Sequence, residues 1–417
     1  MGHSMGGSCT FRRAVVTLCA IVFSSGAPAA AADWLAIRGD LQRTGWQPDE
    51  KVLTVRRVPN LHLLWQQQLS HEPGGLTNPL LLGPIVTRRG IKELVFVRNS
   101  KAVNAIDADL GTIFWTRTLP GGDACAGGSP GRPAMAATVA KASYRPAGED
   151  DDFSDGKKPL YVLAGNGTLY ALRSSNGEDL SPALPFLPPR AVPFSLEADG
   201  NSLYATTSTV CGGAPDHVWT APVNASDFTI GSDPQSQPLG ESHGTGNALV
   251  FEWQGNTVLA RLTGKGSLEL MVSSDRKPLL LSNAQATRVI GGLATWDDAA
   301  GARWIYVSAN GCLSAMQVSG SRDQPTAVSA WVLRDLNAPG PPTVANGVVY
   351  FLAASASSGT SHLVLHAVDA RDGKELYTSG KLIPSLSSSG NLAIANGHVC
   401  FSASDGILYC FGLPFEL

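Results

Sequence analysis

The chain has 417 residues, of which 16% are charged, and its formal net charge of −3 argues against nucleic acid or an anionic membrane surface as a partner. A hydrophobic fraction of 43% supplies a large core and excludes a disordered chain. The 45 glycines and 27 prolines favour a fold with many turns, and hence β structure over long helices.

The first 32 residues have the pattern of a cleaved signal peptide. Arg12 and Arg13 form a short positive region, residues 14–24 are apolar, and residues 30–32 offer a cleavage motif of small side chains. The apolar stretch is too short to span a membrane, and no later stretch is apolar enough to do so. We therefore expect a periplasmic or secreted protein whose residues 33–417 form one domain.

A lone strand pattern at residues 63–69 precedes seven repeated units, some of them degraded, which are interpreted as propeller blades. The units lie near residues 79–120, 131–188, 192–236, 246–275, 289–333, 340–384 and 389–417. The last unit has only three strand patterns, so the lone early strand matches the missing one. Pairing the chain ends in this way closes a propeller and leaves no free sheet edge. The sequence predicts an all-β, seven-bladed propeller closed by an N-terminal strand, and the irregular residues 192–275 leave eight blades open as the alternative count.

Two internal repeats support this fold. Residues 344–351 and 394–401 each place an Asn-Gly pair between two apolar runs, which is a strong hairpin signal because a type I′ turn needs two positive φ angles. A second pattern occurs first as Asp107, Gly111 and Trp115 and again as Asp369, Gly373 and Tyr377. We expect its glycine to supply a positive φ in a turn, and its aromatic residue to pack between neighbouring sheets.

The repeat resembles that of a known family. Residues 169–177, with Leu169-Tyr170-Ala171-Leu172 and Gly177, are similar to the repeat of pyrroloquinoline-quinone (PQQ) dehydrogenase propellers, and residues 33–45 look like the opening segment of many such proteins. The same repeat occurs in non-enzymatic propellers such as the outer-membrane assembly factor of the BamB type. The resemblance covers nearly all of the mature chain and implies a quinoprotein-like β-propeller.

The chain departs from that family at the positions that concern cofactors. The dehydrogenases carry a vicinal cysteine pair stacked on PQQ and bind Ca²⁺ through carboxylates. This chain has no adjacent cysteines, no haem-attachment motif and no carboxylate set that can be assigned to Ca²⁺. Leu18 before Cys19 makes a poor lipobox, unlike that of the lipoprotein assembly factor. The resemblance therefore implies the fold and assigns no catalytic residue, and PQQ and Ca²⁺ stay open as cofactors.

Functional residues of a propeller are expected in the loops that link the blades around one mouth of the central funnel. His71 lies in one such link, and Glu241 and His243 lie in another that is flanked by glycines. Imidazole and carboxylate groups suit a general base or a metal such as Zn²⁺ or Ca²⁺. The competing interpretation is two solvent-exposed polar loops without a ligand.

Three arginines also fall in blade links: Arg190, Arg288 and Arg334. Bidentate guanidinium groups suit a polycarboxylate such as PQQ. The alternative is ordinary surface ion pairing, for instance between Arg334 and its neighbour Asp335.

Two of the seven cysteines, Cys9 and Cys19, lie in the signal peptide, so the mature chain keeps an odd number and at least one unpaired thiol. Cys400 and Cys410 flank a hairpin and are expected to face each other, either as a disulfide or as two buried thiols. Cys125 and Cys211 lie in Gly-rich loops of the predicted funnel face. There, a structural disulfide and unpaired thiols are the two interpretations.

These observations favour an exported binding or scaffold protein, a monomer that presents its funnel face to a protein or cell-envelope partner. One alternative is a PQQ- and Ca²⁺-dependent oxidoreductase, the enzyme class that the resemblance implies. A further alternative is a metal-dependent propeller hydrolase or lactonase that uses His71, Glu241 and His243.

Overall fold

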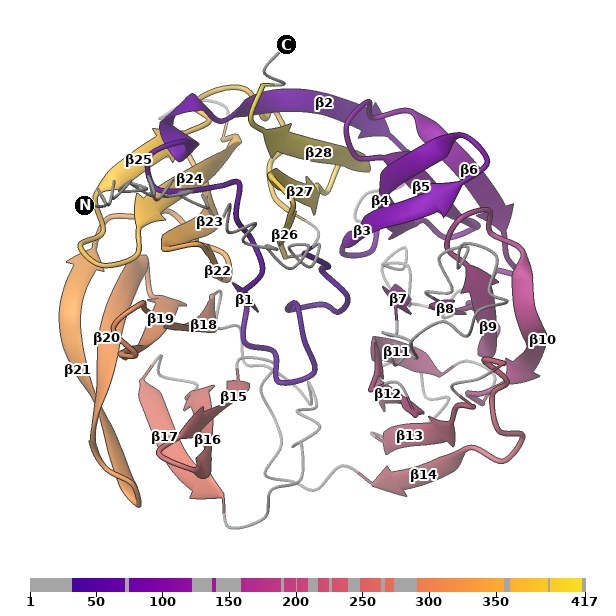
Figure 1. Ribbon diagram of the computed structural model, residues 1–417, viewed down its shortest axis with the longest axis horizontal. Coiled ribbons are helices and arrows are strands. Elements are labelled where there is room, and N and C mark those ends of the chain that lie inside the picture. Colours follow the sequence, from indigo (N-terminus) through magenta and orange to yellow (C-terminus); the bar gives the residue numbers. More distant parts are fainter. Residues whose placement is uncertain are drawn as a thin grey trace, which may run out of the picture. The chain divides into compact units, whose positions relative to one another are not determined.

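Antiparallel sheets follow one another along the chain and surround a centre, as Figure 1 shows for the computed structural model. The described residues are 32–71, 75–121, 137–139, 159–188, 191–199, 201–208, 217–224, 227–238, 248–263, 267–273, 291–355, 361–388 and 391–414. They all belong to one unit, Ala31–Leu417. Its fold is an all-β, seven-bladed propeller, as the repeats predict.

The blades are numbered here in chain order. Blade 1 consists of β3 (Leu80–Thr87), β4 (Gly90–Arg98), β5 (Ala102–Asp107) and β6 (Ile113–Thr118). Blade 2 consists of β7 (Ala137–Val139), β8 (Pro159–Leu163), β9 (Thr168–Arg173) and β10 (Asp179–Pro185). Blade 3 consists of β11 (Val192–Ala198), β12 (Ser202–Ser208), β13 (His217–Pro222) and β14 (Gln235–Pro238). Blade 4 has three strands within the described residues: β15 (Ala248–Trp253), β16 (Asn256–Leu262) and β17 (Leu268–Ser273).

The second half of the chain forms three more blades. Blade 5 consists of β18 (Gly292–Asp297), β19 (Arg303–Ala309), β20 (Cys312–Ser321) and β21 (Gln324–Leu333). Blade 6 consists of β22 (Thr343–Ala345), β23 (Val348–Ala354), β24 (Leu363–Asp369) and β25 (Glu375–Thr378). Blade 7 consists of β26 (Ala393–Ala395), β27 (His398–Ser402), β28 (Ile407–Gly412) and, from the other end of the chain, β2 (His62–Gln68). A single 3-10 turn, η1 (Val58–Asn60), precedes β2.

The ring closes in the predicted way. Strand β2 pairs antiparallel with β28, so that Leu63 lies opposite Phe411 and Gln68 lies opposite Ile407. Blade 7 therefore combines one strand from near residue 65 with three strands from the C-terminal end, and β2 pairs the edge that β28 would otherwise leave free. The described strands form seven blades, and no eighth sheet is present among them.

Glycine in the repeated turn allows neighbouring blades to interlock. Gly111, Gly177 and Gly373 all have positive φ, at 68°, 76° and 73°. A Cβ atom at these positions would come within 2.5 to 2.8 Å of the rings of Trp65, Trp115 and Trp331, each from the outer strand of the preceding blade. Each indole N–H also donates to a backbone carbonyl of the same turn, at 2.6 to 3.1 Å. Each repeat thus joins two blades: the turn glycine of one blade packs against a tryptophan of the preceding blade, and the indole donates to the same turn. We call this contact the clasp.

Candidate functional site

The structure describes only part of the predicted funnel site. His71 follows β2 and Arg334 follows β21, and both side chains are exposed. Glu241, His243, Arg190 and Arg288 lie outside the described residues, as do Cys125 and Cys211. Cys400 and Cys410 form a disulfide between β27 and β28, with their Cα atoms 4.1 Å apart. The predicted assembly of the loop residues stays a prediction.

The middle of the ring is occupied by the chain's own residues 32–50, which Figure 1 shows inside the innermost strands. Backbone hydrogen bonds connect this central segment to four blades: Trp34 exchanges two with Leu81, and the carbonyls of Gln42, Thr44 and Gly45 accept from Val250, Thr295 and Val344. The segment then continues as β1 (Trp46–Gln47), which pairs parallel with β22. At this level of the ring, residues 32–50 therefore already form hydrogen bonds with backbone groups of the inner strands β3, β15, β18 and β22.

Two buried arginines hold the central segment in place. Arg43 lies 2.7 Å from the carboxylate of Glu197 in β11, and both side chains are buried. Arg38 donates to the carbonyls of Leu293 and Pro342, and burial lowers its pKa to about 10. A buried charge without such partners would cost several kcal/mol. The central segment is therefore part of the core, and its two arginines hold it to blade 3 and to blade 5.

A cleft of about 430 Å³ opens at the seam between blade 1 and blade 7. We call it the seam cleft. Its walls include Ile91, Lys92 and Glu93 of β4 and His398 of β27, and Leu413 follows β28 at its edge. These residues come from opposite ends of the chain and meet because the ring closes here.

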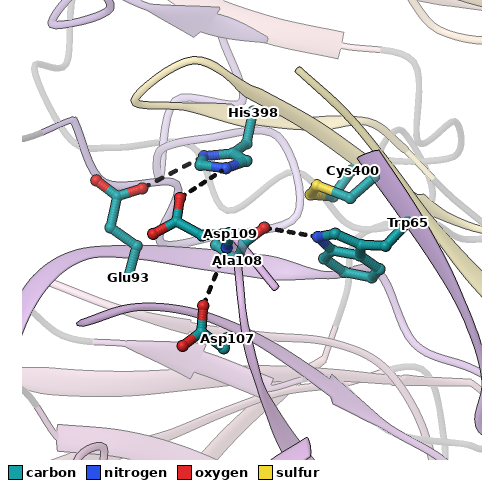
Figure 2. Close-up of a disulfide and its surroundings, with 8 residues drawn as sticks. Trp65, Glu93, Asp107, Ala108, Asp109, His398 and Cys400 are labelled. Carbon is teal, nitrogen blue, oxygen red and sulfur yellow. Dashed lines mark hydrogen bonds and ion pairs between the residues drawn. A yellow bond between two sulfur atoms is a disulfide. The ribbon is translucent and has the colours of Figure 1, made fainter. Parts of the chain in front are cut away.

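Three side chains that can carry charge meet in the seam cleft, as Figure 2 shows. The ring of His398 lies between two carboxylates: Nδ1 is 3.3 Å from Oε2 of Glu93, and Nε2 is 3.4 Å from Oδ1 of Asp109. The three residues can offer donor atoms that all lie within 4.8 Å of one another. His398 is only 5% exposed, so this cluster is largely withdrawn from water.

Local structure positions each member of the cluster. His398 begins β27 directly after the turn of Asn396 and Gly397, and Asp109 lies in the turn that follows β5. That turn is fixed by the carboxylate of Asp107, which accepts the backbone N–H groups of Asp109 and Leu110 and lies 2.8 Å from the ammonium of Lys92. The carbonyl of Glu93 accepts the N–H of the adjacent Ala108 at 2.9 Å. The two carboxylates are therefore held by one blade and the imidazole by the other.

The cluster alters the ionisation of its members. Burial of the ring lowers the pKa of His398, but the carboxylates of Asp109 and Glu93 outweigh this effect and raise the pKa to about 9. Contact with His398 lowers the pKa of Asp109, whereas burial raises the pKa of Glu93. In the absence of another ligand, His398 is therefore a cation at neutral pH that joins blade 7 to blade 1.

Sequence reasoning did not identify Glu93, Asp109 or His398. The sequence led us to expect functional residues in the loops that link blades. These three residues instead lie near turns between strands of the same blade. One signal was present in the repeat. Val348 and His398 occupy the same position after the two Asn-Gly turns, and an imidazole replaces a fully buried valine there. A polar residue in an apolar repeat position indicates a specific contact.

Large apolar side chains are exposed around the seam cleft. Ile91 is 71% exposed, Leu110 63%, Ile113 46% and Val86 39%, and all four lie at the same end of blade 1. Val86 and Ile91 are directly opposite each other across β3 and β4. Half of the large exposed hydrophobic residues in the described part of the chain are in this one place. We call these four residues the apolar rim.

A second hollow, of about 650 Å³, lies between β17 and blade 5. The described residues that line it are uncharged and include Leu268, Leu270 and the thiol of Cys312. Among these described residues there is no carboxylate or imidazole group that could take part in acid–base or mixed-ligand metal chemistry.

No family model matches the sequence, and no curated relative matches it. Solved structures with a similar arrangement include BamB from Moraxella catarrhalis, at 14% identity and a TM-score of 0.34, covering 86% of this chain and 99% of that chain. BBS1N in complex with ARL6DN has 11% identity and a TM-score of 0.46, with 86% and 98% covered. Saccharomyces cerevisiae Sqt1 has 9% identity and a TM-score of 0.43, with 84% and 99% covered.

Identities and TM-scores this low carry no conclusion about function, and the propeller fold is established by the strand pairing itself. In the part of the chain that the structure describes, no helix has the length and apolar character to cross a membrane.

Proposed function

We propose that this chain is an exported binding or scaffold propeller, and that its partner is a protein that docks on the seam cleft and the apolar rim. The observation that carries the proposal is the apolar rim: four large apolar side chains are exposed beside a cleft. Exposed large apolar side chains gathered at one end of a blade are typical of protein-interaction sites. Export rests on the signal-peptide pattern of residues 1–32, which is a prediction from sequence.

The charges around the apolar rim indicate what kind of partner fits. Arg88 and Arg89 are exposed in the turn between β3 and β4, and Arg57 lines the seam cleft from the segment before β2. Arg89 also lies over the ring of Phe114 at 4.9 Å. A partner segment with apolar residues flanked by acidic side chains complements both features. We therefore propose such a segment as the part of the partner that enters the cleft.

The central segment supports a binding role ahead of a quinoprotein oxidoreductase. A planar cofactor at the level of residues 32–50 would have to displace the backbone hydrogen bonds of Gln42, Thr44 and Gly45 and the ion pair of Arg43 with Glu197. Of the three arginines predicted to hold PQQ, only Arg334 is described, and it lies on the exterior of the chain.

The test compares two matched variants of the mature protein. Ile91→Ser with Leu110→Ser removes the two most exposed members of the apolar rim, and Val328→Ser removes an apolar side chain of blade 5 that is 59% exposed. Each is immobilised and exposed to a cell-envelope extract. A species retained by the natural protein and by Val328→Ser, and lost with the rim variant, is the expected result. Equal retention by all three would show that the rim is not the docking surface.

A further inference from the structure

We propose that the seam cleft binds one divalent metal ion of the zinc class, with Nδ1 of His398 and Oε2 of Glu93 as its protein ligands and with Asp109 orienting the imidazole. This inference is independent of the proposed docking of a protein, because it rests on the cluster and not on the apolar rim. The ion would join blade 7 to blade 1 at the point where the ring closes.

The separation of the ion pair between His398 and Glu93 also fits two ligands of one metal ion. Nδ1 and Oε2 lie 3.3 Å apart, yet both atoms are fully buried without a hydrogen bond of normal geometry among the described residues. Buried polar atoms usually have a partner. For an ion about 2.1 Å from each atom, the angle Nδ1–ion–Oε2 would be about 105°, which is close to the tetrahedral value for zinc.

The other side of the ring has the arrangement that metal-binding histidines use. Nε2 of His398 lies 3.4 Å from Oδ1 of Asp109. A ligating imidazole commonly donates its second N–H to a carboxylate, which fixes the tautomer and the ring orientation. Asp109 is well placed for this role because its own turn is held by Asp107.

Neighbouring charged groups are already engaged and do not complete the site. Lys92 pairs with Asp107 at 2.8 Å. The carboxylate of Glu50 accepts backbone N–H groups from Val52, Leu53 and Gly397 at 2.6 to 3.0 Å. Two protein ligands therefore leave open positions on the ion for water or a donor group of a partner, and the three residues of the cluster all line the seam cleft.

The donor set selects among ions. One imidazole nitrogen and one carboxylate oxygen suit Zn²⁺ or Co²⁺, whereas Ca²⁺ and Mg²⁺ prefer oxygen ligands alone. Binding must displace the proton from the ligating nitrogen, so affinity should increase with pH.

The experiment uses the mature protein after treatment with a chelator that is then removed. Zn²⁺ is titrated by calorimetry, and Co²⁺ binding is followed by its visible absorbance. We expect one ion per chain and a higher melting temperature. His398→Gln and Glu93→Gln should each weaken binding at least about tenfold, and Asp109→Asn should weaken it by about 10- to 100-fold.

A matched control exists on blade 6. Nδ1 of His366 lies 3.0 Å from Oε1 of Glu375 in a normal hydrogen bond, at a more exposed position. His366→Gln should leave the affinity for Zn²⁺ unchanged. Because His398→Gln could unfold the seam, Glu93→Gln provides a second variant, and circular dichroism checks that both are folded. The absence of binding at millimolar Zn²⁺, or binding that these two folded variants retain in full, would overturn the proposal.

Discussion

At the scale of single residues, His398 shows how one change in a repeat creates a site. The equivalent Val348 in blade 6 is fully buried in an apolar core, whereas His398 faces two carboxylates from the neighbouring blade. Burial by itself would disfavour an imidazolium, so the cation is present only because Glu93 and Asp109 are held opposite it. The contacts of His398 with blade 1 therefore make the stability of the seam dependent on pH.

We expect the chain to lose stability as the pH rises from about 6.5 to 9 in the presence of a chelator. The pKa of His398 is raised to about 9 in the folded protein, so its contribution is complete below the unfolded pKa of about 6.5 and disappears above 9. The loss should be at most about 3 kcal/mol. Lys92 and Glu50 also face the cluster, through their charges beside Asp109 and Glu93. Chemical unfolding across this pH range measures the effect.

His398→Gln is the control for the pH dependence. The variant should be less stable at pH 6.5, because two carboxylates lose their cation, and its stability should change little between pH 6.5 and 9. A pH slope equal to that of the natural protein would show that another group is responsible.

The clasp glycines give a second prediction at this scale. Gly111→Ala should destabilise the chain more than Gly255→Ala, although both positions have positive φ, at 68° and 81°. The shared backbone strain costs about 1–2 kcal/mol. Only Gly111 faces a tryptophan ring, since a Cβ there would be 2.5 Å from Trp65 and the position at Gly255 is open. Overpacking adds about 1–3 kcal/mol. Equal shifts in the unfolding midpoint would contradict the clasp.

At the scale of elements, blade 7 takes its outer strand β2 from near residue 65 and its other three strands from the C-terminal end of the chain. Its strands β27 and β28 are joined by the disulfide of Cys400 and Cys410, which is fully buried beside Val95 and Ile106 of blade 1. The covalent bond therefore lies close to the seam with blade 1, and it joins the hairpin whose strand β28 pairs with β2. It stabilises the hairpin that receives the N-terminal strand.

Replacement of both cysteines by alanine should destabilise the chain by about 2–3 kcal/mol, because the disulfide closes a short loop. The natural protein should lose a similar amount when it is unfolded under reducing conditions. The double alanine variant is then the control, because its unfolding midpoint should not respond to the reductant. A reductant effect that persists in this variant would assign it to another cysteine.

The elements could largely be predicted from sequence, and the reasons are local. Alternating apolar residues and the Asn-Gly pairs at residues 346 and 396 specify hairpins within a few residues of themselves, and both asparagines do adopt positive φ. The surplus strand near residue 65 and the three-stranded last unit together predicted the closure. His398 could not be assigned a role in this way, because its partners are about 300 residues distant along the chain.

At the scale of the whole molecule, the central segment connects blades that do not adjoin. It contacts β3 through Trp34, β15 through Gln42 and β18 through Thr44. A propeller whose blades contact only their neighbours distributes its stability around the ring. Here a segment in the middle adds contacts between distant blades, and sequence alone did not indicate this, because residues 32–50 carry no pattern that specifies their partners.

The ion pair of Arg43 with Glu197 offers the most direct test of that central segment. The two side chains are buried, 2.7 Å apart and 154 residues distant in sequence, and Arg43 also donates to Ser195 at 3.4 Å. Arg43→Leu should destabilise the protein by about 3–5 kcal/mol, because it leaves the carboxylate of Glu197 buried without a counter-charge. Arg43→Leu combined with Glu197→Leu removes both charges and should recover most of that loss. Denaturant unfolding of the two single variants and the double variant measures the coupling. If the losses simply add, Arg43 acts by packing alone, and the central segment is not held in place by charge.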